Sequence, residues 1–330
     1  MKTAVVILNW NGKKLLEQFL PSVVSYSQEA TIYVADNAST DDSIAFVKTH
    51  FPTIRIISNE GNFGYAKGYN DALRFVEEDI YALVNSDIEV TENWLSPIVE
   101  IFGNQPETAI IQPKILDYKN KGYFEYAGAG GGFIDKYGYP FCRGRIFNTL
   151  EKDFGQYDDE TDIFWASGAC FFIRKTVYRE LGGFDADFFA HQEEIDLCWR
   201  AFNNNLKVKY CGKSTVYHVG GATLNSQNPK KTYLNFRNSL YAIIKNVPRS
   251  SLFTTLFIRL LLDGTAGLHF LLQGKLSHVF AIIKAHFACY WNFFGQYRKR
   301  VAFGKEKYFL ANSIVIQYFI NKKKRFQELF

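Results

Sequence analysis

The chain has 330 residues, of which 47% are hydrophobic and 22% charged, and its net charge is +5. A chain of this length and composition can bury a sizeable core, which excludes an intrinsically disordered protein. The five cysteines are scattered without a CxxC pair, which argues against a disulfide framework and favours a reducing compartment.

The first 115 residues alternate short apolar runs with amphipathic segments. We predict strands over residues 3–9, 31–36, 54–58, 80–85 and 109–112. We predict helices over residues 12–25, 41–50, 65–76 and 92–102. This alternation is typical of an α/β fold with a mostly parallel sheet, in which ligands bind at the carboxyl ends of the strands.

The character of the chain changes after residue 115. Residues 116–165 are rich in Gly, Tyr and Asp and predict loops with short antiparallel strands. Further on we predict a buried strand over 169–173, a helix over 193–203 and two short strands over 208–210 and 215–218. From about residue 230 the pattern becomes helical and basic.

Charge is distributed unevenly along the chain. Residues 231–330 hold 16 Lys and Arg against 3 Asp and Glu, a balance of +13, whereas the rest of the chain has a balance of −8. An acidic body suits a divalent metal, and a basic, aromatic-rich tail suits an anionic surface, either membrane or nucleic acid. No compact nucleic-acid recognition motif is evident, so we expect no nucleic-acid partner.

Two apolar segments bear on localisation. The run at residues 5–8 is too short for a signal peptide, so we expect the active part to face the cytoplasm. The segment 251–272 is very apolar but is interrupted by Arg259, Asp263 and His269. We therefore expect it to lie in a membrane interface or pack on the catalytic domain rather than span a bilayer.

Polar residues follow several predicted strands, each with an ordinary structural alternative. Asp36 at a strand end could accept hydrogen bonds from a base or ribose, although Thr40 or Asp41 there could simply cap the next helix. The glycines of residues 59–70 could let backbone approach a nucleotide, with Lys67 at a phosphate, although glycine-rich turns of this kind are common.

Three further positions could bind a metal or transfer a proton. Asp87 follows a buried strand, where a carboxylate is costly unless it pairs or binds a cation; the alternative is a solvated turn residue. His218 could ligate Mn²⁺ or be purely structural. Carboxylates at the amino end of the helix 193–203 could include a general base or form an ordinary acidic first turn.

The order of these blocks resembles the family 2 glycosyltransferases with the GT-A fold, over roughly residues 3–245. The resemblance rests on the blocks VVILNWNG, DNASTDDS, GNFGYAKGYN, VNSD, WASGACFFIR, EEID and YHVGG. The nearest subgroup resembles bacterial rhamnosyltransferase-like enzymes, which build surface polysaccharide on lipid-linked acceptors. The resemblance implies a nucleotide-sugar-binding half over 1–115, an acceptor and catalytic half over 116–229, and a helical basic region over 230–330.

The same resemblance implies roles for individual residues. The nucleotide sugar would contact Trp10, Asn11, Asp36, Asn62, Gly64, Lys67, Asn85, Ser86 and Asp87. Mn²⁺ or Mg²⁺ would be held by Asp87 and His218. Glu194 would be the catalytic base, where the family more commonly has Asp, and Asp196 is the reserve. The acceptor side would be lined by Trp165, Gly168, Ala169 and Glu193.

The predicted activity is inverting transfer of a sugar, with rhamnose favoured, from a nucleotide diphosphate donor to a saccharide hydroxyl. The donor nucleotide is expected to be dTDP or UDP, and the acceptor a saccharide or a polyprenyl-diphosphate-linked saccharide. Residues 230–330 would bind the membrane surface or form a homodimer.

Two other functions compete with this prediction. A sugar-phosphate nucleotidyltransferase needs a Gly-rich basic loop after the first strand. This chain reads NWNGKK there, which contains too little glycine for such a loop. A catalytically silent sugar-binding module is the second alternative, and the intact Asp87, Glu194 and His218 argue against it.

Overall fold

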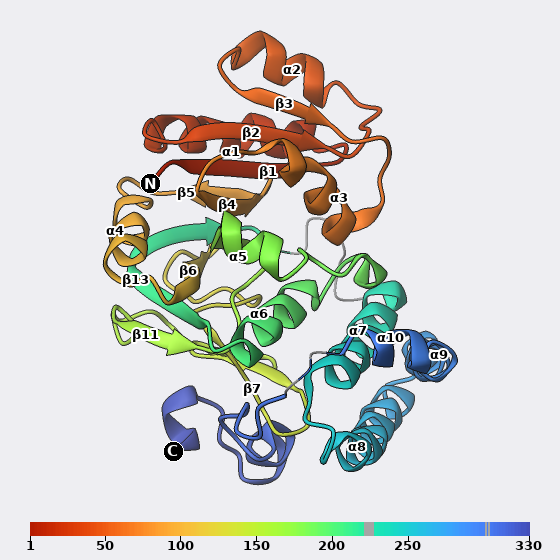
Figure 1. Ribbon diagram of the computed structural model, residues 1–330. Helices are drawn as coiled ribbons and strands as arrows, with labels where there is room; N and C mark the ends of the chain where they lie inside the picture. Colours follow the sequence, from red (N-terminus) through yellow and green to blue (C-terminus); the bar gives the residue numbers. More distant parts are fainter. Residues whose placement is uncertain (221–227, 301, 303) are drawn as a thin grey trace.

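A curved central sheet flanked by helices forms the body of the protein, as the computed structural model in Figure 1 shows. The structure describes residues 1–220, 228–300, 302 and 304–330. Nine strands make up this sheet: β1 (Thr3–Asn9), β2 (Thr31–Asp36), β3 (Arg55–Ser58), β4 (Ile80–Asn85), β5 (Ile88–Val90), β6 (Thr108–Asp117), β11 (Glu160–Ile163), β12 (Cys170–Arg174) and β13 (Lys207–His218).

The strand order is β11-β13-β6-β12-β4-β1-β2-β3, and β5 pairs with β13. Strands β4, β1, β2 and β3 are mutually parallel. Strand β12 runs antiparallel between β4 and β6. The first residues of β12 therefore lie at the same sheet edge as the last residues of β4.

Helices lie on both faces of the sheet and, in the case of α8–α10, beside it. They are α1 (Lys13–Tyr26), α2 (Ser43–His50), α3 (Gly64–Ala72), α4 (Ser96–Asn104), α5 (Lys175–Glu180), α6 (Glu193–Asn203), α7 (Pro229–Asn246), α8 (Leu252–Leu272), α9 (Leu276–Trp291) and α10 (Phe293–Arg298). Single helical turns occur at Leu73–Phe75, Ala186–Phe188, Ile316–Ile320 and Phe326–Leu329. A small antiparallel sheet comprises β7 (Gly132–Ile134), β8 (Pro140–Cys142), β9 (Arg145–Ile146) and β10 (Thr149–Leu150).

Two apolar clusters fill the space on the two sides of the sheet. Successive side chains of β1 alternate between them, because a strand points its residues to opposite faces in turn. Val5 and Ile7 pack with residues of α1, α2 and α4. Ala4 and Val6 belong to the cluster that contains residues of α3, α6 and α7. Burial on both faces explains why the parallel strands are almost entirely apolar.

The structure confirms the predicted α/β class and most of the predicted elements. Strands 3–9, 31–36 and 80–85 and helix 193–203 have the predicted bounds. The helix predicted to start at residue 92 starts instead at Ser96, because Pro97 suits a first turn and Trp94 is buried outside the helix.

Other strands are longer or more joined than predicted. The strand predicted over 109–112 extends over ten residues as β6. The two strands predicted over 208–210 and 215–218 are one strand, β13, with a register shift between Cys211 and Thr215. The antiparallel strands expected within 116–165 are confirmed as β7–β11.

The region predicted to be helical from about residue 230 is helical in α7–α10, the described residues beyond Arg298 form only two single turns, and α7 is packed into the main core. Leu240, Ile243 and Val247 belong to the same buried cluster as Ala4 of β1. In Figure 1, α7 lies beside α6, α8–α10 are grouped around α7, and the C-terminal end lies at the lower left, away from α8 and α9. Within the described residues, α8 is the one helix long and apolar enough to cross a membrane by length and composition.

Candidate active site

The candidate site lies where β1, β2 and β4 end and β12 begins. Asn9 at the end of β1 pairs in register with Asp36 at the end of β2. The backbone N–H of Asn85, at the end of β4, donates to the carbonyl of Ala169 (2.9 Å). The sheet topology thus brings the predicted nucleotide residues next to the predicted acceptor residues Gly168 and Ala169.

Two loops at this edge are fixed against each other. Asp36 is buried; its Oδ1 accepts from Asn9 Nδ2 (2.9 Å) and its Oδ2 from the N–H of Ser39 (2.9 Å). Asn11 Oδ1 accepts from the N–H of Thr40 (2.7 Å). Trp10 lies between the hydrogen-bonded residues of this loop pair and is 52% exposed. The indole ring is therefore accessible, and Asn11 beside it is exposed as well.

The glycine-rich segment before α3 touches the catalytic half directly. Gly64 has φ +88°, and a Cβ there would lie 2.4 Å from the carbonyl oxygen of Phe189, so only glycine fits. Asn62 Oδ1 accepts from the N–H of Gly64 (3.1 Å). Lys67, expected near a phosphate, pairs with Asp71 (2.6 Å) in the structure.

His218 lies between two buried carboxylates. Its Nε2 is 3.2 Å from Asp87 Oδ1, and its Nδ1 is 3.4 Å from Glu125 Oε1. Burial alone would lower the pKa of His218, but the charges and hydrogen bonds of Glu125 and Asp87 outweigh it and raise the pKa to about 10. This position therefore stabilises positive charge, whether carried by a proton or by a divalent cation.

The residues present fit a hard divalent cation. Asp87 and His218 are each 5% exposed and supply one carboxylate and one imidazole, which suit Mn²⁺ or Mg²⁺. His218 Nδ1 is a buried nitrogen without a hydrogen-bond partner of good geometry, and Glu125 lies on its side. Asp87 and His218 would be the two protein ligands, because no cluster of three or more His, Cys, Asp and Glu residues suited to a metal occurs in the part of the chain that the structure describes.

Two adjacent glutamates occupy the amino end of α6. Each has a buried Oε2 atom without a hydrogen-bond partner. Burial is the main cause that raises the pKa of Glu194 to about 7, against the opposing effect of nearby backbone N–H groups. Burial and the charge of Glu194 also raise the pKa of Glu193. With a pKa of about 7, the Glu194 carboxyl group can exchange a proton near neutral pH.

Glu194 faces the start of β12. A Cβ added to Gly168 would lie 3.6 Å from Glu194 Cδ and 3.4 Å from the hydroxyl of Tyr65. That hydroxyl donates to the carbonyl of Gly168 (2.7 Å). Gly168 therefore lies within contact distance of both the Glu194 carboxyl group and the Tyr65 hydroxyl.

The loop before α6 is strained. Phe189, His191 and Gln192 have φ values of 63°, 70° and 71°, which non-glycine residues rarely adopt. Such backbone costs on the order of 1–3 kcal/mol per residue and persists only where its surroundings hold it. Burial lowers the pKa of His191 to about 4, so this side chain is neutral.

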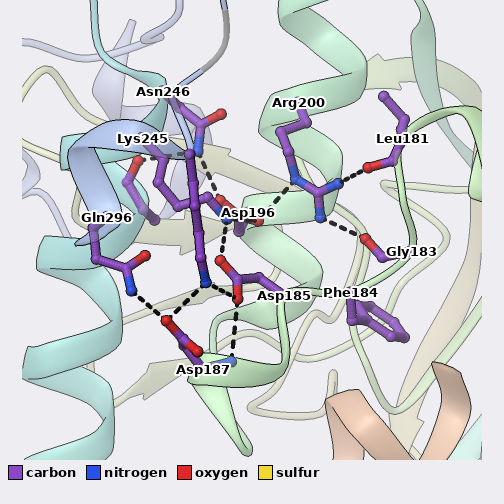
Figure 2. Close-up of polar contacts among 12 residues, drawn as sticks. Leu181, Gly183, Phe184, Asp185, Asp187, Asp196, Arg200, Lys245, Asn246 and Gln296 are labelled. Carbon is purple, nitrogen blue, oxygen red and sulfur yellow. Dashed lines mark hydrogen bonds and ion pairs between the residues drawn. The ribbon is translucent and has the colours of Figure 1, made fainter. Parts of the chain in front are cut away.

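The structure corrects the prediction of Asp196 as the reserve base. Asp196 is fully buried, and its two oxygens accept from Arg200 Nε (2.9 Å), Lys245 Nζ (2.7 Å) and Asn246 Nδ2 (2.8 Å). Figure 2 shows it among these partners, with Asp185 and Asp187 nearby. The carboxylate of Asp196 is engaged in structural contacts and has no free face for a substrate hydroxyl.

Trp165 also has a different place from the one predicted. It is 3% exposed, its indole lies against Gly132, and its Nε1 donates to the carbonyl of Phe133 (2.8 Å). Trp165 thus joins the small sheet to the central sheet and does not line an open acceptor side.

Sequence reasoning missed three residues around the site. Glu125 beside His218 lies in a segment without periodicity, so no signal marked it. Tyr65 lies within the glycine-rich block, but its contact with Gly168 was not predicted. Asn238 of α7 donates to the loop before α6, and a single Asn on a helix carries no sequence signal.

Comparison with known proteins identifies the family. Residues 4–182 match the family described as "Glycosyl transferase family 2". The chain belongs to this family. It is a glycosyltransferase of glycan or polysaccharide biosynthesis with the GT-A fold, as the resemblance in the sequence implied. The match ends before Glu194 and His218, so the proposed roles of these residues rest on their geometry.

Two relatives illustrate its similarity to other glycosyltransferases. The chain is 23% identical over 286 residues to the low-salt glycan biosynthesis hexosyltransferase Agl10 of Haloferax volcanii, covering 84% of this chain and 87% of that protein. It is 23% identical over 209 residues to the N-acetylglucosaminyl-diphospho-decaprenol L-rhamnosyltransferase of Mycobacterium tuberculosis, covering 58% of this chain and 68% of the relative.

Solved structures share the fold at low identity. S. aureus TarS 1-349 in complex with UDP-GlcNAc has a TM-score of 0.57 at 16% identity, covering 86% of this chain and 79% of that one. GalNAc-T7 with UDP, GalNAc and Mn²⁺ has a TM-score of 0.57 at 17% identity, covering 74% and 47%.

Proposed function

We propose that this glycosyltransferase moves a sugar from a nucleoside diphosphate donor to a saccharide hydroxyl in a single inverting displacement, with Glu194 as the base. The observation that carries the proposal is the half-buried Glu194, whose Oε2 atom is buried without a hydrogen-bond partner and whose carboxyl group lies against Gly168. The loops of Trp10 and Asp36 would hold the nucleotide.

Each step assigns one task to the residues at this sheet edge. Glu194 takes the proton of the acceptor hydroxyl while that oxygen attacks the anomeric carbon from the side opposite the leaving diphosphate. A base with a pKa of about 7 is matched to physiological pH, since about half of it is deprotonated there and the carboxylate is a stronger base than an ordinary one. Holding donor and acceptor in line removes much of the entropic barrier.

Asp87 and His218 would hold a divalent cation, Mn²⁺ or Mg²⁺, which when bound neutralises negative charge on the leaving diphosphate. Glu125 would orient His218 from its far side, as carboxylates commonly do for ligating histidines. The Mn²⁺ named in the description of GalNAc-T7 supports a cation in this fold.

The acceptor is proposed to be lipid-linked, because α8 and α9 turn apolar side chains outward. The two charged residues of α8 point inward: Asp263 is fully buried and pairs with Arg259 (2.8 Å), Tyr139 (2.6 Å) and His286 (3.0 Å). Large exposed hydrophobic side chains on α8–α10 are Phe253, Phe257, Leu260, Leu261, Leu268, Leu271, Leu272, Leu276, Phe280, Ile283, Phe287, Tyr290, Trp291 and Phe294. An apolar patch of this extent is typical of a membrane or protein contact.

The charge around this outward face favours a membrane over a protein partner. Asp263 is the one acidic residue between positions 251 and 298, and it is buried, whereas Lys275 and Lys284 are exposed. Anionic lipids of the cytoplasmic leaflet attract such lysines by about 1 kcal/mol each. The outward face would therefore bring the active site to a polyprenyl-diphosphate-linked saccharide.

The tail carries two basic clusters, residues 298–300 and 322–325, and neither lies on this outward face. In the first cluster, Lys299 pairs with Asp185 and Asp187 (both 2.7 Å). Arg300 donates to the carbonyls of Ile244 and Val247, so these two residues face the protein. Residues 322–325 belong to the C-terminal end, which lies apart from α8 and α9 in Figure 1. The apolar helices α8 and α9 are the better candidates for contact.

The donor proposal stays with dTDP or UDP, and rhamnose is the favoured sugar. Support comes from the relative named as an L-rhamnosyltransferase acting on a decaprenol-linked sugar and from neighbours solved with UDP or UDP-GlcNAc.

Glu194→Gln should keep donor binding and lower kcat by at least about 100-fold, because general base catalysis typically contributes that much. In the wild type, kcat should rise with pH and level off above about 7, since the base acts only when deprotonated. Steady-state kinetics from pH 5 to 9 check both. Glu180→Gln, which changes an exposed glutamate of α5, is the control and should keep turnover; normal turnover by Glu194→Gln would exclude Glu194 as the base.

Asp87→Ala and His218→Ala should each weaken Mn²⁺-dependent UDP or dTDP binding by at least about 10-fold, because each removes one protein ligand. Isothermal titration calorimetry with and without Mn²⁺ measures the loss. Asp117→Asn changes another carboxylate at the end of a strand and should leave binding unchanged. Equal Mn²⁺-dependent affinity in all four proteins would remove the metal role.

The triple variant Phe257→Ser, Phe287→Ser and Trp291→Ser should float with anionic liposomes at least about 10-fold less than the wild type. Each exposed aromatic side chain that enters the interface contributes on the order of 2 kcal/mol. Phe154→Ser, which alters an equally exposed Phe outside α8–α10, should float normally. Equal flotation of all proteins would refute the membrane proposal. It would also be refuted if light scattering showed a wild-type dimer that the triple variant does not form.

A further inference from the structure

A buried side chain of α7 reaches across to the loop that precedes the catalytic helix. Asn238 is fully buried, and its Nδ2 donates to the carbonyls of Phe188 (2.9 Å), Ala190 (3.0 Å) and His191 (2.7 Å). One amide group thus contacts three carbonyls within four consecutive residues. The neighbouring Arg237 adds a contact from Nη2 to the carbonyl of Phe188 (3.1 Å).

The three carbonyls belong to the strained segment that leads into Glu193 and Glu194. Left-handed backbone at residues 189, 191 and 192 turns successive carbonyls in directions that no helix or strand would satisfy. Between the three carbonyls bound to Asn238, the carbonyl of Phe189 points the other way and accepts from the N–H of Tyr65 (2.7 Å) in α3. The loop is therefore held from both sides, by the donor half and by α7.

A second contact made by α7, this time with α6 itself, lies two helical turns further along α7. Lys245 follows Asn238 by seven residues, so both side chains lie on one face of the helix. Lys245 Nζ binds Asp196 (2.7 Å) and Asp185 (2.8 Å), which flank the loop in sequence, as Figure 2 shows. Helix α7 thus fixes both the loop and the first turn of α6.

We propose that Asn238 is a positioning residue for Glu194. By binding three carbonyls of the loop 188–192, it sets the backbone from which Glu194 projects beside Gly168. Asn238 itself touches no substrate. The inference rests on the proposed role of Glu194 as the base, and it makes α7 part of the catalytic centre although it follows the predicted catalytic half.

A double-mutant cycle on the full-length enzyme tests this proposal, with Asn238→Ala made in the wild type and in Glu194→Gln. In the wild type, Asn238→Ala should lower kcat per folded molecule at least about 10-fold and keep the donor Kd within about 2-fold, because the nucleotide loops are untouched. In Glu194→Gln, the same change should have no further effect on kcat, since the base it positions is already absent.

Ser239→Ala is the matched control, because Ser239 is the next residue, is equally buried, and donates to Gly138 rather than to the loop. It should keep kcat in both backgrounds. An equal loss of kcat from Asn238→Ala in both backgrounds, or a loss only of thermal stability, would overturn the proposal. Normal turnover by Glu194→Gln alone would instead refute the proposed function.

Asn238→Ser provides a second variant if Asn238→Ala does not fold. Serine keeps one donor and should show the same pattern at smaller size. Faster amide hydrogen exchange at residues 189–193, with unchanged exchange in the nucleotide loops, is the expected accompanying result. Unchanged exchange at 189–193 together with unchanged kcat would overturn the proposal.

Discussion

The buried ion pair between Asp196 and Lys245 is the contact on which the arrangement of the site depends. It joins the first turn of α6 to α7, with Arg200 and Asn246 completing the contacts of the Asp196 carboxylate. Such a pair contributes little net stability, but loss of one partner leaves a buried charge and typically costs 3–5 kcal/mol. Its effect is to fix α6 in one orientation, in which Glu194 lies against Gly168 while Ile195 and Trp199 pack in the core.

The site concentrates features that the rest of the fold avoids. Glu193 and Glu194 bury carboxyl oxygens without partners, and the loop before them is strained. Burial raises the pKa of Glu194, so folding favours its protonated form and stability falls as pH rises from the unfolded value toward 7. The apolar clusters on both faces of the sheet offset this cost, a common balance between stability and activity.

The sequence was most informative where structure is local. Strands β1, β2 and β4 were predicted with correct bounds because each is a β-branched run that ends at a polar residue. Strand β5 was missed because its three residues are held by long-range pairing with β13. The strained loop was also missed, because its backbone is set by contacts with α3 and α7.

The candidate site could be predicted only in part, and for the same reason. Asp87 and His218 were singled out at the ends of predicted strands, and the structure places His218 Nε2 3.2 Å from Asp87 Oδ1. The sequence could not decide between Glu194 and Asp196 as the base, because both are carboxylates in the first turn of one predicted helix. The choice between the two depends on which side of α6 meets α7. In α8, Arg259 and Asp263 interrupt an apolar sequence, but in the structure they form its inward side. Periodicity alone could not tell which side of α8 faces out.

The central claim is that Glu194 is a half-buried base whose carboxyl group gains and loses its proton near neutral pH. The most direct measurement is a pH titration of ¹³C-labelled glutamate carboxyl groups by NMR, in which Glu194 is assigned by the signal lost in Glu194→Gln. The account predicts that this carboxyl group titrates near pH 7, as burial raises its pKa to about 7. Titration at the ordinary glutamate value, about 4.3, would contradict it.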